Sequence, residues 1–183
     1  ADFSGSIGAQ IQMVTKRGAE AAVLAARGGA RVALITSAIE TIGQMSCNPA
    51  IGGIAKGTVV REVDALGGVM GRATDRASLQ FRMLNRSKGP AVWAPRAQCD
   101  RALYRAAVRA ELERIPGLRL VQGTVAALDV IGGAVSGVRT LEGRRFAARA
   151  VVITTGTFLR GRIHIGTDTS VAGGRAGEAA TTH

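Results

Sequence analysis

Hydrophobic positions in the first fifth of the chain follow first a strand period, then a helix period, then a strand period. Apolar residues within 18–27 recur at helical spacing, which predicts a helix with one buried face. A glycine pair ends this helix, and the apolar run RVALIT at 31–36 predicts a buried strand. A weaker apolar segment, 11–14, lies where the first strand of a βαβ unit is expected.

The middle of the chain is predicted to be mostly helical. Apolar residues at helical spacing predict helices over 58–66, 69–77 and 96–115, and a Pro-Gly pair stops the last and longest. An alternating strand over 79–84 precedes a loop over 85–92 that contains glycine and proline. The apolar side of the longest helix consists of Leu103, Tyr104, Ala107, Val108, Leu112 and Ile115.

The period changes to that of strands after residue 117. Short strands separated by glycines predict an antiparallel β-meander over 118–148, beginning with a strand at 118–122. A buried strand, AVVITT at 150–155, follows, and the last twenty residues have no clear period. Helices and strands in this order predict an α/β fold.

The least generic stretch is QMSCNPAIGGIAKG, residues 44–57. Glycine permits positive φ and a close approach of backbone to a ligand, while proline fixes φ and removes a donor. The stretch therefore predicts a loop that exposes backbone N–H groups to a ligand. An ordinary surface turn with a free cysteine explains the composition equally well.

Composition limits the class of protein. The chain has 183 residues, 46% hydrophobic, with a mean hydropathy of +0.17, which is enough for one globular domain. Aromatic residues make up only 3%, so small aliphatic side chains must build the core. Two cysteines form no disulfide framework and favour a reducing compartment. No secretory segment and no transmembrane run stand out, which predicts no membrane association.

The charge is strongly positive. A formal net charge of +11 and a pI of about 11.4 favour an anionic partner such as nucleic acid or a phosphate-bearing cofactor. Arg101, Arg105 and Arg109 fall on one face of the longest predicted helix, where they could meet phosphates. A solvated arginine-rich helix face is the alternative.

Two nucleotide-binding motifs fail on their spacing. The dinucleotide fingerprint needs G-x-G-x-x-G between strand and helix, but residues 13–18 read MVTKRG and only Gly18 remains. The segment GGIAKGT at 52–58 has Lys-Gly where a phosphate-binding loop requires Gly-Lys. Neither motif by itself identifies a ligand.

Cys47 is the candidate reactive side chain. A lone cysteine is usually inert, and a reactive thiol needs a lowered pKa. Lys56 and a helix beginning near Gly57 could lower it. The two histidines, His164 and His183, and the two cysteines have no metal-ligand spacing, so no metal site is predicted.

Several motifs in series resemble the MnmG (GidA) family. They are MSCNPAIGGIAKG, REVDALGG, RMLNRSKGPAV, RAQCDRALYR, VITTGTFLRGRIHIG and AGGRAGE, and they cover about residues 18–178. The resemblance implies a Rossmann-type FAD/NAD(P)-binding domain, interrupted by an NADH-binding insertion and followed by a helical region that docks an MnmE-type GTPase. It also implies a cytoplasmic homodimer that uses FAD, NADH and a methylene-folate carbon to build a carboxymethylaminomethyl group on C5 of the tRNA wobble uridine.

The resemblance also implies roles for individual residues. Cys47 matches a family cysteine proposed to act in catalysis, and Gly18 is the remaining glycine of the pyrophosphate loop. Val125 falls where the family contacts FAD through its backbone, and Thr155, Gly156 and Thr157 match a second loop beside the flavin. The residues assigned to the cofactor are Gly18, Ser46, Asn48, Pro49, Gly52, Gly53, Lys56, Val125, Thr155, Gly156 and Thr157.

The chain departs from the family at its start. The family has G-G-G-H-A-G where this chain has MVTKRG, and the long side chains of Lys16 and Arg17 should crowd a pyrophosphate. We therefore expect 1–183 to be an incomplete, N-terminal part of the FAD-binding domain. In it 1–17 is atypical, the insertion and docking regions are missing, and the chain alone is inactive. The alternatives are a non-catalytic basic RNA-binding remnant without flavin and a decayed product without a stable fold.

Overall fold

The protein forms two compact units. The computed structural model describes residues 10–15, 18–45, 48–171 and 173, and for 10–15 it describes the backbone only. The sheet unit takes its described residues from the ranges Ala1–Gly18, Ala25–Glu40 and Pro116–His183. The helix–hairpin unit consists of Ala19–Leu24 and Thr41–Ile115.

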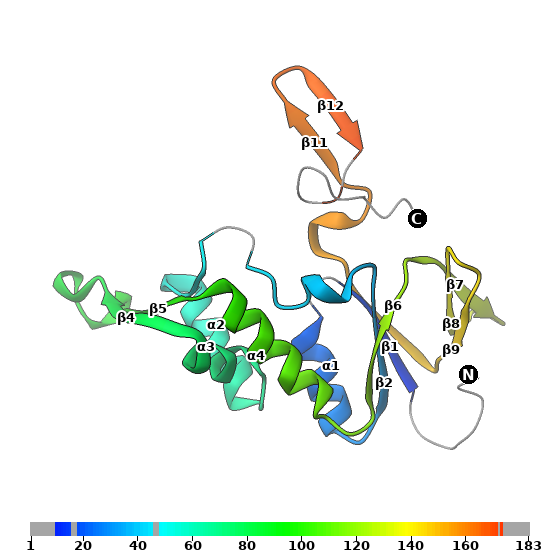
Figure 1. Ribbon diagram of the computed structural model, residues 1–183, viewed down its shortest axis with the longest axis horizontal. Coiled ribbons are helices and arrows are strands. Elements are labelled where there is room, and N and C mark those ends of the chain that lie inside the picture. Colours follow the sequence, from blue (N-terminus) through cyan, green and yellow to red (C-terminus); the bar gives the residue numbers. More distant parts are fainter. Residues whose placement is uncertain (1–9, 16–17, 46–47, 172, 174–183) are drawn as a thin grey trace. The chain divides into compact units, whose positions relative to one another are not determined.

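A parallel sheet forms the framework of the sheet unit (Figure 1). The strands β1 (Gln10–Thr15) and β2 (Arg31–Thr36) pair in parallel and are connected through α1 (Ala19–Arg27). With β6 (Leu118–Gln122) and β10 (Ala150–Thr154) they make the order β10-β1-β2-β6. The predicted βαβ unit, including its weak first strand, is confirmed.

A second sheet in this unit is antiparallel. It contains β7 (Val125–Ile131), β8 (Ala134–Thr140) and β9 (Arg145–Ala147) in sequential order. Its residue Val138 joins Ala33 and Ile35 of β2 in a buried cluster, against which Val121, Val125, Phe146 and Val151 pack. The predicted meander is confirmed for residues 125–147, and it packs on the parallel sheet.

Among its described residues the helix–hairpin unit contains the first part of α1, three complete helices and a three-stranded antiparallel sheet of order β3-β5-β4. Its helices are α2 (Ile54–Ala65), α3 (Met70–Ala77) and α4 (Arg101–Glu113). Its strands are β3 (Ala50–Gly52), β4 (Ser78–Leu84) and β5 (Ala94–Cys99). Two single 3-10 turns, η2 (Arg86–Lys88) and η3 (Pro90–Val92), connect β4 to β5, and a third, η1 (Ile39–Thr41), follows β2.

The longest predicted helix begins later than expected. Residues 96–99 belong to β5, and α4 starts at Arg101. Asp100 has extended backbone angles, and its carboxylate accepts a hydrogen bond from the Leu103 N–H at 2.8 Å. An aspartate in this position ends the strand and caps the helix. Asp100 is therefore the residue in the sequence that could have indicated where α4 begins.

The apolar side of α4 is also narrower than predicted. Tyr104, Ala107, Val108 and Leu112 are buried, as expected. Leu103, however, is 55% exposed, so its assignment to the buried side was wrong. It lies one position before Tyr104 and therefore falls outside the buried stripe.

The stretch 44–57 is more regular than a loop. Ala50–Gly52 forms β3, and α2 begins at Ile54, four residues before the predicted start of that helix. Lys56 and Gly57 therefore lie inside the first turns of α2. Gly57 is buried, and a Cβ added to it would lie 3.4 Å from the Pro95 carbonyl oxygen, which is an ordinary contact distance.

Two further expectations change in the sheet unit. The strand at 118–122, predicted to open the meander, is β6 and pairs with β2 in the parallel sheet. The region without clear period contains a hairpin of β11 (Arg162–Ile165) and β12 (Asp168–Val171). No helix in the described ranges is both long and apolar enough to cross a membrane.

Candidate cofactor site

The candidate site of the sheet unit lies where parallel strands end. Gly18 is buried between the end of β1 and the start of α1. In a parallel sheet, the turns after neighbouring strands meet at one edge, and the first N–H groups of a following helix point toward that edge. Gly18 therefore lies at this edge of the parallel sheet. Lys16 and Arg17 lie outside the described residues.

A second turn follows β10, the other neighbour of β1. After Thr154 the chain enters the 3-10 turn η4 (Gly156–Phe158), in which Gly156 has φ 59°. Phe158 is buried, and its N–H donates to the Thr155 carbonyl at 3.2 Å. Phe158 anchors this turn, which leaves the small residues Gly156 and Thr157 exposed.

Val125 is connected to the end of β2 by two features. The Gly123 N–H donates to the Thr36 carbonyl at 2.9 Å, which joins the segment before Val125 to the last residue of β2. The half-buried Val125 side chain packs on the cluster that contains Ala33 and Ile35. Gly18, Val125 and residues 155–157 thus all belong to segments attached to the parallel sheet.

The remaining candidate residues belong to the helix–hairpin unit. Asn48 and Pro49 lead into β3, and the Pro49 carbonyl accepts from the Cys99 N–H at 2.7 Å. The Lys56 ammonium donates to the Ala50 carbonyl at 3.1 Å. Ser46 and Cys47 lie outside the described residues.

The two glycines of this stretch differ in their surroundings. Both have positive φ, 111° at Gly52 and 101° at Gly53. A Cβ on Gly52 would meet the backbone of Pro95 and Arg96 on β5, whereas a Cβ on Gly53 would meet nothing within 4 Å. Gly52 is therefore required for the pairing of β3 with β5. Gly53 has free space on the side where a Cβ would lie.

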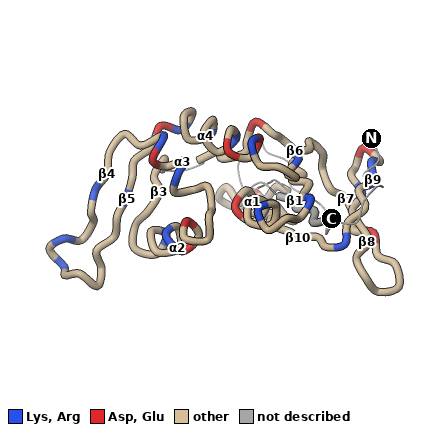
Figure 2. Tube along the Cα trace, turned by 90° about the horizontal axis from the view of Figure 1, so that it is seen from below, with Lys and Arg blue, Asp and Glu red and all other residues tan. Residues whose placement is uncertain are grey.

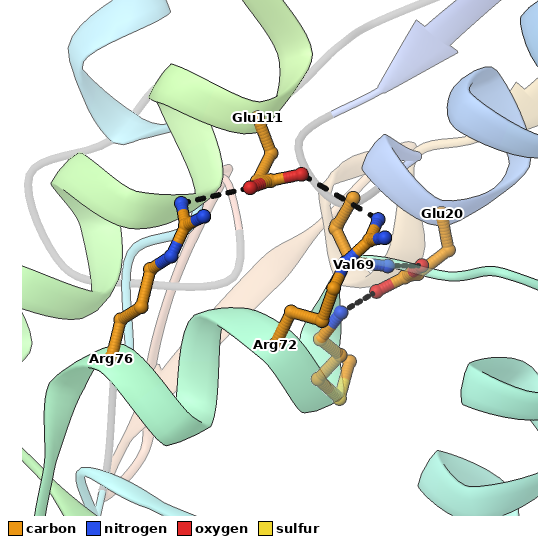
Figure 3. Close-up of polar contacts among 6 residues, drawn as sticks. Glu20, Val69, Arg72, Arg76 and Glu111 are labelled. Carbon is orange, nitrogen blue, oxygen red and sulfur yellow. Dashed lines mark hydrogen bonds and ion pairs between the residues drawn. The ribbon is translucent and has the colours of Figure 1, made fainter.

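Glu20, in the first turn of α1, is a structural residue that the sequence motifs did not identify. Its carboxylate accepts hydrogen bonds from the Met70 N–H at 2.6 Å and the Val69 N–H at 2.7 Å, at the start of α3 (Figure 3). These N–H groups have no acceptor within the helix. On α4, Glu111 pairs with Arg76 at 2.8 Å and with Arg72 at 3.5 Å, which joins α3 to α4.

Replacing Glu20 with alanine should lower the free energy of unfolding by about 1–2 kcal/mol, because the two N–H groups at the start of α3 lose their acceptor. Urea unfolding followed by far-UV circular dichroism measures this change. The exposed Glu40 provides a control, and Glu40→Ala should change stability by less than about 0.5 kcal/mol. Equal effects of the two substitutions would contradict the capping role of Glu20.

Cys99 contrasts with the candidate Cys47. It is 1% exposed, and burial raises the pKa of its thiol, although nearby Lys56 acts in the opposite direction. Lys56 thus lies near Cys99. A buried neutral thiol is inert toward electrophiles.

Cys99 should resist iodoacetamide in the folded protein at neutral pH and react once urea unfolds the chain. The variant Cys47→Ser isolates this thiol, and mass spectrometry counts the adducts. A raised pKa in the folded state also means that stability falls as pH rises above the value of the unfolded thiol, about 8.5–9. Rapid alkylation of Cys99 in the folded Cys47→Ser protein would show that the thiol is accessible.

The arginine stripe is exposed, as expected. Arg101, Arg105 and Arg109 lie on the solvent side of α4, and Arg109 pairs with Glu113 at 2.7 Å. No group of three or more His, Cys, Asp or Glu side chains within the described ranges could hold a metal ion. The helix–hairpin unit therefore offers cationic groups and no cluster of metal ligands among its described residues.

Comparison with known proteins assigns the chain to a family. Residues 16–183 match the model of the family called Glucose inhibited division protein A, GIDA. The chain belongs to the GIDA family. Among curated GIDA relatives, the tRNA uridine 5-carboxymethylaminomethyl modification enzyme MnmG of Salinibacter ruber is 57% identical over 166 residues. That alignment covers 90% of this chain and 25% of the relative, so the chain spans about a quarter of the relative's length.

Solved structures agree with the GIDA assignment. Aquifex aeolicus GidA in its form II crystal superposes with a TM-score of 0.86 at 48% identity, covering 95% of this chain and 29% of that one. The probable FAD-dependent monooxygenase PqsL of Pseudomonas aeruginosa superposes with a TM-score of 0.53 at 17% identity, over 78% of this chain and 41% of that one. The latter likeness shows the fold alone. The predicted Rossmann-type fold and the predicted family are confirmed.

Proposed function

We propose that this chain is the FAD-binding part of an enzyme that modifies the wobble uridine of tRNA at C5. The observation that carries the proposal is the β1–Gly18–α1–β2 unit, flanked by β10 and its Thr155–Thr157 turn. Membership in the GIDA family supports the substrate, because a relative in that family is named as a tRNA uridine modification enzyme. The complete protein would use FAD, NADH and a methylene-folate carbon.

The described residues suit a dinucleotide cofactor. Gly18 and the first N–H groups of α1 would hold the pyrophosphate, because a helix N-terminus attracts anions. The backbone near Val125 and the Thr155–Thr157 turn would contact the rest of the cofactor from their anchored positions. When bound, FAD would supply the oxidation and reduction chemistry.

The other candidate residues complete this proposal from the helix–hairpin unit. Cys47 would act as the catalytic thiol, and Ser46, Asn48, Pro49, Gly52, Gly53 and Lys56 would form the segment beside the flavin. Residues 1–183 would be an incomplete FAD-binding domain, inactive alone. In the complete cytoplasmic protein it would work as a homodimer with an MnmE-type GTPase.

Flavin content tests the proposal directly. The purified chain, incubated with FAD and desalted, should retain absorbance near 450 nm. Two variants, Gly156→Ala and Gly132→Ala, should cause the same backbone strain. The two glycines have φ 59° and 58°, and an added Cβ would meet nothing within 4 Å at either position. Gly156→Ala should lower flavin retention severalfold, and Gly132→Ala, in the β7–β8 turn, should not. Equal retention by both variants would place the cofactor away from the Thr155–Thr157 turn.

The unusual segment MVTKRG gives a second flavin experiment. Changing residues 13–17 to GGGHA restores the glycine-rich pattern and removes two long side chains beside the proposed pyrophosphate position. This variant should bind FAD more tightly than the natural chain. If flavin affinity does not rise, then Lys16 and Arg17 do not obstruct the cofactor.

A second candidate function is a basic RNA-binding module without flavin. The formal charge of +11 and the exposed Arg101, Arg105 and Arg109 favour it. Binding of tRNA that weakens with salt, by a chain that retains no FAD, would select this alternative. Oxidation of NADH and modification of tRNA by the isolated chain would contradict the expectation that it is inactive alone.

A further inference from the structure

The β4–β5 hairpin, residues 78–99, carries a charge pattern that the cofactor site does not use. The sequence has no acidic residue between Asp75 and Asp100. Within this interval the hairpin contains Arg82, Arg86, Lys88 and Arg96. Figure 2 shows basic residues along β4 and at the end of the hairpin, with no acidic residue between them. We call residues 78–99 the basic hairpin.

Two of these arginines lie directly opposite each other. Arg82 on β4 is the register partner of Arg96 on β5. Cross-strand partners lie on the same face of a sheet, and like charges in this arrangement oppose pairing. Among the described residues no carboxylate forms an ion pair with either arginine. The pair therefore forms a positive site that an external anion would relieve.

The end of the hairpin adds cations and an ordered aromatic ring. Arg86 and Lys88 are exposed on the turn η2. The Trp93 indole N–H donates to the Arg86 carbonyl at 3.2 Å, while 49% of the residue remains exposed. The Asn85 amide donates to the Val92 carbonyl at 3.2 Å and closes the turn. The ring is thus held in place before any partner arrives, with part of its surface open.

An exposed aromatic ring on a hairpin that carries four cationic side chains fits single-stranded nucleic acid. Phosphates are attracted by arginine and lysine, and unstacked bases pack on aromatic rings. Phe81 on β4 is also exposed, but it lies on the face of the hairpin opposite to Arg82 and Arg96. An apolar protein surface would leave the Arg82–Arg96 repulsion uncompensated. Of these two partners, RNA is the one that charge complementarity favours.

We propose that the basic hairpin binds a single-stranded or loop region of RNA, with Arg82 and Arg96 contacting phosphates and Trp93 stacking on a base. This deepens the proposed function, because it assigns a contact surface to the RNA substrate class of that function. The basic hairpin differs from the arginine stripe Arg101, Arg105 and Arg109, which lies on α4. The aromatic residue of α4, Tyr104, is buried, so no exposed ring accompanies that stripe.

The experiment measures binding of an unmodified tRNA transcript to the full 183-residue chain by fluorescence anisotropy across salt concentrations. The double variant Arg82→Gln/Arg96→Gln should reduce the slope of log K against log salt by about 1.4, given about 0.7 per contact on a single strand. Trp93→Leu should weaken binding about tenfold with little change in that slope. The control Arg114→Gln/Arg139→Gln makes the same charge change at two exposed sites outside the hairpin and should leave the slope nearly unchanged.

Folding and flavin are measured on the same samples. Arg82→Gln/Arg96→Gln removes a repulsion, so its urea midpoint should equal or exceed that of the natural chain. Its FAD retention should be unchanged, so loss of RNA binding is distinguishable from failure of the flavin proposal. A lower midpoint together with weaker binding would show that the two arginines serve the fold instead.

Three results would overturn the proposal. If the hairpin variant and the control variant lost tRNA affinity equally, the RNA would be attracted by the net charge of the protein and not by this hairpin. Loss confined to an Arg101→Gln/Arg105→Gln variant would assign RNA to the α4 stripe. Unchanged tRNA binding in both hairpin variants would show that RNA does not contact this surface. The exposed apolar residues of the hairpin would then favour a protein as the partner.

Discussion

Gly52→Ala should destabilise the helix–hairpin unit by at least about 3 kcal/mol, which is the sum of backbone strain and overpacking. Gly52 has φ 111°, a value that residues with a side chain rarely adopt. An added Cβ would lie 2.8 Å from the Arg96 Cα, besides meeting the Pro95 carbonyl. These are backbone atoms of a paired strand, so the neighbour cannot move aside without breaking the β3–β5 pairing. Urea unfolding of the purified variant measures the loss.

Gly53→Ala is the matched control for this substitution. Gly53 has a similar φ of 101°, but nothing lies within 4 Å of the position of its Cβ. Only the backbone strain remains, which costs about 1–2 kcal/mol. If the two variants lost equal stability, then the contact with β5 would contribute nothing and strain alone would explain both.

Leu112→Ala should lower the free energy of unfolding by about 2–5 kcal/mol, the usual range for deleting a fully buried leucine side chain. Leu112 is 0% exposed on α4, where it lies among Tyr104, Ala107 and Val108 on the buried face. The substitution removes apolar surface from the core and leaves a cavity. Chemical unfolding with matched m-values measures the difference.

The same helix supplies the control for Leu112. Leu103 is 55% exposed, so Leu103→Ala should cost less than about 0.5–1 kcal/mol. The two substitutions delete the same atoms and have the same effect on helix propensity, which leaves burial as the difference. A Leu103 effect as large as that of Leu112 would mean that another surface covers Leu103 in solution.

Much of the sheet unit followed from local sequence. RVALIT predicted β2 because a continuous apolar run can be buried on both faces of a parallel sheet. The period of apolar residues placed α1, α3 and the meander, since alternation and helical spacing act within a few residues. The apolar run at 150–155 predicted the strand β10, although the strand is not buried as expected, since Ile153 is 53% exposed.

The errors arose where a single residue or a distant strand decides the structure. A helix period continued through residues 96–99, but Asp100 caps α4 and pairing with β4 makes 94–99 a strand. Residues 118–122 have the pattern of a hairpin strand, yet pairing with β2 places them in the parallel sheet. The glycines in 44–57 predicted a loop throughout, whereas pairing with β5 makes 50–52 a strand and α2 begins at Ile54.

The sequence alone therefore determined the α/β class, the family, the βαβ unit and the basic charge of this protein. Apolar periodicity and motif order depend on neighbours along the chain, so they can be read without coordinates. The tertiary structure decided the strand partners, the reason for Gly52, the bonds from Glu20 to α3 and the opposed pair Arg82–Arg96. Each of these joins residues that are distant in sequence, and no local pattern specifies which distant backbone or side chain a residue will meet.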